Sequence, residues 1–198
     1  MTWWLAARRA HPYLTCGLGC FAVLILVSRD YLVSLPSITP SGGQVLVMLF
    51  VPLPVCVALM MCLESGLRHA EQTGIRRVAL MDNGLILCVA LAATAIGAAS
   101  AQLLTSPAAH AVGRNAVFLM GIMLIMRPIM GSAAVLAPAG WVIAVTVLGR
   151  TSAHTPRPWS ILPYRGDDPV MLAVAWLALA VGMAGIHIPR NRLQLPWQ

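Results

Sequence analysis

The chain has 198 residues, of which 59% are hydrophobic and 10% charged, and this balance excludes a water-soluble globular protein because too few polar residues are present to cover its surface. All thirteen basic residues are arginine, so the chain lacks the lysine that a GxxxxGK(S/T) loop places on nucleotide phosphates. The net charge of +7 comes from arginines scattered between apolar runs, which argues against a nucleic-acid-binding patch and is typical of a protein that spans a bilayer.

The N-terminal sequence TWWLAARRA (2–10) places two tryptophans ahead of two arginines. This combination suits the headgroup layer of a membrane and predicts a short interfacial helix. The alternative is the charged leader of a signal peptide. No small-residue cleavage site follows the apolar stretch, so we expect the segment to remain in the mature protein. The first membrane span is predicted over residues 12–33.

Two further spans flank a charged segment. The loop LPSITPSGG (35–43) contains prolines and glycines that stop regular structure. A second span is predicted over 44–63, with a kink at its PLP sequence, because proline removes a backbone hydrogen bond. The charged segment follows at 64–82, a third span is predicted over 79–104, and 105–115 is expected to be a short loop.

The stretch 116–149 is too long for one membrane helix and short for two full crossings. We expect two short helices, over about 115–127 and 131–149, that turn near Arg127-Pro128. The alternative is one kinked span over 115–137 followed by a re-entrant segment. Hydrophobic periodicity does not decide between the two.

The longest polar loop, RTSAHTPRPWSILPYRGDDP (150–169), leads to a last predicted span over 169–187. Asp168 followed by Pro169 is a helix-start signal, since aspartate caps free backbone N–H groups and proline suits the first turn. The sequence therefore predicts an all-α integral membrane protein with about six transmembrane helices and a short N-terminal interfacial helix. We expect residues 1–198 to form a single transmembrane domain.

With six spans, both termini lie on the same side of the membrane. Placing them in the cytoplasm puts eight arginines there and five outside, which is the bias of the positive-inside rule. We therefore expect a multi-pass protein of the cytoplasmic membrane whose 64–82 segment faces the cytoplasm. The cytoplasmic set is Arg8, Arg9, Arg68, Arg76, Arg77, Arg127, Arg190 and Arg192, and the outer set is Arg29, Arg114, Arg150, Arg157 and Arg165.

The segment ESGLRHAEQTGIRRVALMD (64–82) carries charges of both signs between two apolar runs. Glu64 and Arg68 are four residues apart, and Arg68 and Glu71 are three apart, which supports a short helix. One explanation is a positive anchor that only fixes orientation. Because acidic and amide side chains are interleaved with the arginines, docking on a soluble protein is the second explanation. The expected docking residues are Glu64, Arg68, Glu71, Gln72, Arg76 and Arg77.

The order of these elements resembles that of the membrane subunits of ABC-type export permeases, especially the small ones encoded apart from their ATPase. In that family an interfacial helix leads into the first span, a short cytoplasmic helix between spans two and three contacts the ATPase, and a short helical pair precedes the last span. The parallel segments here are 2–10, 64–82 and 113–128. The resemblance implies a non-catalytic permease subunit whose 64–78 helix contacts a separate ATP-binding subunit, and which pairs with itself or a sister permease.

Small residues recur every three or four residues on two predicted spans. Ala93, Gly97 and Ala101 form one ridge, and Ala178, Gly182 and Gly185 form another. Such ridges let membrane helices approach closely. Packing within the subunit is the preferred interpretation, and the seam of a dimer is the alternative.

Metal and catalytic sites find little support in the sequence. The five cysteines all lie in apolar runs, and their odd number argues against a disulfide framework. Thiol and thioether ligands suit Cu(I), but no CxxC or HxxxH spacing is present, so we expect no metal site. No set of residues suggests acid–base or nucleophilic catalysis, and we expect neither an enzyme nor a bound cofactor.

Arg127 and Asp82 each have two explanations. Inside the bilayer each would be costly and would face protein or a water-filled cavity. At the cytoplasmic edge each would be an ordinary charge at the end of a span, and this interpretation is preferred.

The alternative function is a structural or accessory subunit of a larger membrane complex. Short loops and alanine-rich faces suit that role equally well. The sequence identifies neither the transported substrate nor the direction of transport, and it does not decide between a homo-oligomer and a hetero-oligomer.

Overall fold

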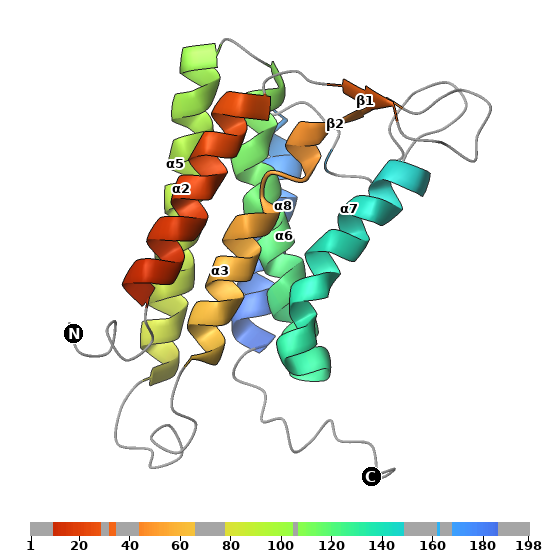
Figure 1. Ribbon diagram of the computed structural model, residues 1–198. Coiled ribbons are helices and arrows are strands. Elements are labelled where there is room, and N and C mark those ends of the chain that lie inside the picture. The colour runs from red at the N-terminus through yellow and green to blue at the C-terminus, as the bar shows by residue number, and fades with distance from the viewer. Residues whose placement is uncertain are drawn as a thin grey trace.

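The protein is a bundle of helices with one small pair of strands at one end (Figure 1). The computed structural model describes residues 10–28, 32–34, 44–65, 78–104, 107–148, 162 and 168–185. The helices of the bundle are α2 (Ala10–Ser28), α3 (Leu53–Glu64), α5 (Val78–Leu104), α6 (Pro107–Met130), α7 (Leu136–Leu148) and α8 (Pro169–Gly185). The short 3-10 helices η1 (Val47–Leu49) and η2 (Gly131–Val135) precede α3 and α7.

The helices alternate in direction. We call the end at which α3 ends and α5 begins the base, which is the lower end in Figure 1, and the opposite end the top. Helices α2, α5 and α7 run from the base to the top, and α3, α6 and α8 run back. Strands β1 (Leu32–Ser34) and β2 (Gln44–Leu46) pair antiparallel at the top, with Val33 opposite Val45.

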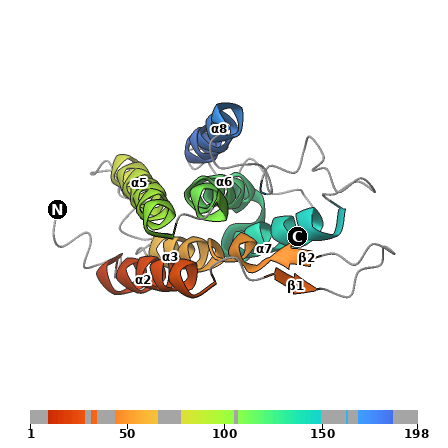
Figure 2. The same cartoon turned by 90° about the horizontal axis from the view of Figure 1, so that it is seen from above.

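Helix α6 is the centre of the bundle. Seen from above, α2 and α3 lie on one side of it, α8 lies on the other, and α5 lies beside it (Figure 2). Residues 111–121 of α6 are all buried. The largest fully buried side chains of α6 are Leu119, Met120, Met123 and Leu124, which join one core cluster with residues of α2, α3, α5, α7 and α8.

Four helical stretches of the described chain are long and apolar enough to cross a membrane, so the prediction of about six spans is wrong. They are His11–Ser28, Val47–Glu64, Leu80–Leu104 and Ala111–Leu148, and Pro169–Gly185 is a shorter apolar helix. The prediction counted 115–149 as two spans and 169–187 as another, whereas Ala111–Leu148 is a single run of helical residues that turns back on itself at Gly131, and α8 is shorter than the four long stretches. The fold has the helix lengths and composition of a multi-pass membrane protein.

This region forms two helices joined by a turn, as the preferred of the two sequence-based alternatives has it, but the bounds and the position of the turn differ. Helix α6 begins at Pro107 rather than near 115, and it continues through Pro128 to Met130. The chain turns at Gly131, whose φ of 61° is a left-handed conformation that glycine adopts without a steric penalty. Pro128 lies in the last turn of α6, where proline supplies no N–H donor, and the helix ends two residues later at Met130.

Two predicted span boundaries also need correction. Helix α2 ends at Ser28 rather than at 33, and residues 44–46 form β2 rather than the start of a span. Apolar and β-branched residues suit a strand as well as a helix, so an apolar run does not reveal where a helix ends. The predicted start of the last helix is confirmed, because the backbone N–H of Val170 donates to Asp168 Oδ1 at 3.0 Å and α8 begins at Pro169.

Candidate functional site

Most of the expected docking residues lie outside the described part of the chain. The same is true of residues 2–9 of the expected interfacial helix. Glu64 is the last residue of α3, and it lies at the base. The described chain therefore shows where the charged segment leaves α3 and where α5 begins at Val78. The docking residues outside the described ranges are Arg68, Glu71, Gln72, Arg76 and Arg77.

The carbonyl groups at the end of α3 are bound by one donor that directly follows the helix and by another from α6. The last carbonyls of any helix lack partners within the helix itself. Here Ser65 Oγ donates to the carbonyl of Cys62 at 2.8 Å, and Arg127 Nη2 of α6 donates to the carbonyl of Leu63 at 3.3 Å. Arg127 is thus a C-terminal cap of α3 that comes from another helix. We call Leu63, Glu64, Ser65 and Arg127 the Arg127 junction.

Arg127 also balances the charge of Glu64. Glu64 Oε1 lies 3.7 Å from Arg127 Nη2, and the two side chains are 25% and 20% exposed. An acidic residue at the C-terminal end of a helix is unfavourable because the negative end of the helix dipole lies there, and a cation offsets this repulsion. Because both side chains reach solvent, we expect the ion pair alone to contribute at most about 1 kcal/mol.

Asp82 lies at the same end of the bundle as the Arg127 junction. Arg127 is in the last turn of α6, and Asp82 is a buried residue near the start of α5. Nearby, Leu85 of α5 packs with Cys62 of α3 and with Leu14 of α2. The base is therefore the place where α2, α3, α5 and α6 are tied together next to the ends of the charged segment.

A second polar cluster lies inside the upper half of the bundle. Arg114 was expected in an outer loop, but it is a residue of α6 and is only 2% exposed. Its Nε and Nη2 atoms donate to Asn115 Oδ1 at 3.4 and 3.2 Å. Asn115 Nδ2 in turn donates to the backbone carbonyl of Leu162 at 3.2 Å. We call Arg114, Asn115 and Leu162 the Arg114 cluster.

The burial of Arg114 marks it as a candidate functional residue that the sequence did not reveal. It lies roughly 10 Å below Pro107, at 1.5 Å per residue along the helix. Charged residues inside membrane helices are costly, and they face protein or a cavity when they occur. The sequence Thr105-Ser106-Pro107 was the available signal, because a hydroxyl residue followed by proline is typical of a helix start.

The ridge on α5 lies against α6. Ala93, Gly97 and Ala101 are buried. A Cβ atom at Gly97 would lie 2.8 Å from both the Cα and the N atoms of Gly113 on α6, which is closer than real contacts allow. The backbones of α5 and α6 therefore touch where both helices carry glycine.

The ridge on α8 lies against the opposite side of α6. A Cβ atom at Gly121 would lie 2.7 Å from the backbone C atom of Ala178, and one at Gly182 would lie 2.9 Å from the carbonyl oxygen of Gly121. Helix α6 is thus held between two glycine contacts, one with α5 and one with α8. These contacts fix where the Arg127 junction and the Arg114 cluster lie along the axis of the bundle.

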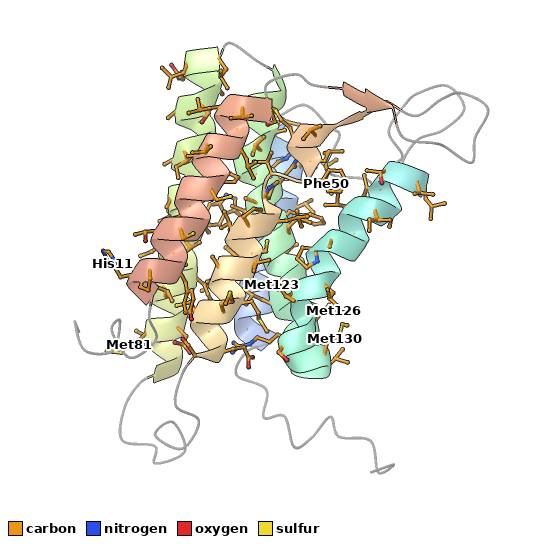
Figure 3. The ribbon with its side chains drawn as sticks, viewed as in Figure 1. His11, Phe50, Met81, Met123, Met126 and Met130 are labelled. Atoms are coloured by element: carbon orange, nitrogen blue, oxygen red, sulfur yellow. The ribbon has the colours of Figure 1, made fainter. Side chains whose placement is uncertain are left out.

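The sulfur-containing residues do not gather in one place. Figure 3 shows Met123 inside the bundle, and Met126 and Met130 lower down at its right edge. In the described ranges, no group of three or more histidine, cysteine or acidic residues could hold a metal ion. Among the cysteines, Cys16, Cys20 and Cys88 are exposed and Cys56 and Cys62 are buried.

Comparisons with protein-family models, with curated proteins and with solved structures find no match to this chain. The two polar clusters and the helix contacts that position them are therefore the features from which its function is inferred.

Proposed function

We propose that this chain is the membrane-spanning permease subunit of an ABC-type exporter in the cytoplasmic membrane, driven by a separate ATP-binding subunit that docks on the 64–78 segment. The observation that carries the proposal is the Arg127 junction. It connects the C-terminal end of α3, where the charged segment begins, with the last turn of α6. An anchor that only fixed orientation would need charges near lipid headgroups, whereas a docking segment needs a firm connection to the helices that it moves.

The junction offers a route along which force can pass into the bundle. A partner that displaces the 64–78 segment also displaces the end of α3, and Arg127 makes the end of α6 follow. Helix α6 continues through η2 into α7, and its glycines touch the backbones of α5 and α8. Because packed helices shift as units between discrete arrangements, this movement would change the spacing of α5, α7 and α8.

Exchanging the charges at positions 68 and 71 tests the docking segment. We expect the tagged chain, purified from its native membranes, to bring down an ATP-hydrolysing subunit. The variant R68E/E71R keeps the net charge but sets like charges against each other across the interface, so we expect at least a roughly tenfold lower recovery of that subunit. Recovery is measured by quantitative mass spectrometry of the purified material.

The control is R192E, which changes a charge in the C-terminal tail and should leave recovery unchanged. An accessory role in a larger complex predicts that other membrane subunits are recovered and no ATP-hydrolysing subunit is. That result, or full recovery of the ATP-hydrolysing subunit with R68E/E71R, would overturn the proposal.

Replacing Arg127 by glutamine tests the route of force. A cysteine introduced at Ser132, an exposed residue of η2 at the base, serves as a probe for maleimide labelling. In the complex we expect its labelling rate to differ between the nucleotide-free and ATP-bound states. In R127Q that difference should fall at least about fivefold, because the charged hydrogen bond to Leu63 and the pairing with Glu64 are both lost. The ATP-binding subunit should still be recovered.

R127K is the matched control, because lysine keeps the charge and one donor and should retain part of the nucleotide response. A full response in R127Q would show that force does not pass through Arg127.

A further inference from the structure

Leu162 is held inside the bundle although it is distant in sequence from the helix that holds it. It is 1% exposed and belongs to the same core cluster as the side chains of α6. Its backbone carbonyl accepts a hydrogen bond from Asn115, which is 47 residues away in the sequence. Leu162 is therefore held both by its buried side chain and by its backbone carbonyl.

Asn115 is bound at both ends of its amide. Its Oδ1 atom accepts from Arg114, and its Nδ2 atom donates to Leu162. A guanidinium bound to the amide oxygen polarises the amide and makes its N–H groups stronger donors. It also fixes which end of the amide faces Leu162. Arg114 is thus a positioning residue for the contact between Asn115 and Leu162.

We propose that the Arg114 cluster is a polar latch that keeps Leu162 inside the top of the bundle, and that Leu162 leaves the bundle only when Asn115 releases its carbonyl. Both groups of this hydrogen bond are buried, so its loss leaves an amide and a carbonyl without water to replace the contact. This cost stabilises the state in which Leu162 lies inside the bundle. The latch acts at the end of α6 opposite the Arg127 junction.

Maleimide labelling of a cysteine at position 162 measures the latch. The probe is L162C in a chain whose exposed Cys16, Cys20 and Cys88 are replaced by alanine, purified and placed in lipid nanodiscs, and labelled with a membrane-impermeant maleimide from both faces. We expect the cysteine to be protected. The variant N115D keeps the shape of the side chain and still accepts from Arg114, but its carboxylate cannot donate to the Leu162 carbonyl. Labelling should become at least about tenfold faster.

The matched control is S100A. Ser100 is also a buried polar residue of the upper half, but its hydroxyl donates to the carbonyl of Ile96 in its own helix at 2.7 Å. Its loss should leave the labelling of L162C unchanged. If S100A accelerates labelling as much as N115D does, the effect is a general loosening of the bundle and the latch is ruled out.

Two results overturn the proposal directly. One is that L162C in the chain that keeps Asn115 is labelled as fast as a cysteine at the exposed position 132. The other is that folded N115D, judged by gel filtration and circular dichroism, shows no acceleration. If N115D does not fold, R114Q replaces it, since it keeps Asn115 but removes the polarising cation. We expect at least about threefold faster labelling, and no change would exclude the positioning role of Arg114.

The experiment uses neither nucleotide nor a partner subunit. Its outcome is therefore independent of the proposed permease function, and either proposal can fail while the other stands.

Discussion

Replacing Gly121 by alanine is expected to lower the free energy of unfolding by about 1–3 kcal/mol, the usual cost of overpacking a rigid contact. The added Cβ atom would lie 2.7 Å from the backbone C atom of Ala178 and from the backbone N atom of Leu179. Backbone atoms cannot rotate away as the end of a side chain can, so α8 must move away from α6. The gain of about 1 kcal/mol in helix propensity on replacing glycine by alanine offsets only part of this cost.

The unfolding of Gly121→Ala is measured by titrating the protein with SDS in mixed micelles and following circular dichroism. Gly140→Ala on α7 is the control, because a Cβ atom there meets nothing within 4 Å. That variant should be as stable as the parent or more stable by about 0.4–1 kcal/mol. If Gly121→Ala were also as stable as the parent, α6 and α8 would not pack as closely as described.

Replacing Gly97 by alanine is expected to have a cost of the same size, about 1–3 kcal/mol, at the contact between α5 and α6. The new Cβ atom would lie 2.8 Å from the Cα and N atoms of Gly113, again with only backbone opposite it. Gly97→Leu should be more destabilising still, because a longer side chain has no space to occupy between the two helices.

Gly84→Ala is the control for Gly97→Ala, since Gly84 lies on the same helix and a Cβ atom there meets nothing within 4 Å. The difference in unfolding free energy between the two variants isolates the helix contact from helix propensity. Equal stability of the two variants would contradict the close approach of α5 and α6.

These glycine contacts explain how a membrane protein with few polar residues holds a fixed arrangement. Lipid is as apolar as a leucine side chain, so apolar burial gives little driving force between helices in a membrane, and close packing must supply it. Helix α6 makes such contacts on two sides and carries Arg114 and Arg127. The two arginines lie roughly 20 Å apart at 1.5 Å per residue. A shift of α6 at the base would therefore also move the part of α6 that carries Arg114.

The sequence by itself determined the class of protein and several local features. Composition indicated a membrane protein, and the apolar run at 79–104 is α5 with almost the predicted bounds. The start of α8 followed from Asp168 and Pro169, because capping depends only on neighbouring residues. The glycine and alanine ridges were visible in the sequence because helical spacing alone puts such residues on one face.

Only the tertiary structure decided four other features: the number of long spans, the position of the turn at Gly131, the burial of Arg114 and the contacts of Arg127. The partners concerned are far apart in the chain: Asn115 binds Leu162, and Arg127 binds Leu63, 64 residues away. In a membrane protein, apolar residues face lipid as readily as they face protein, so the hydrophobic pattern does not show which side of a helix is buried. The packing of one helix against another decides whether an arginine lies in a loop or inside the bundle.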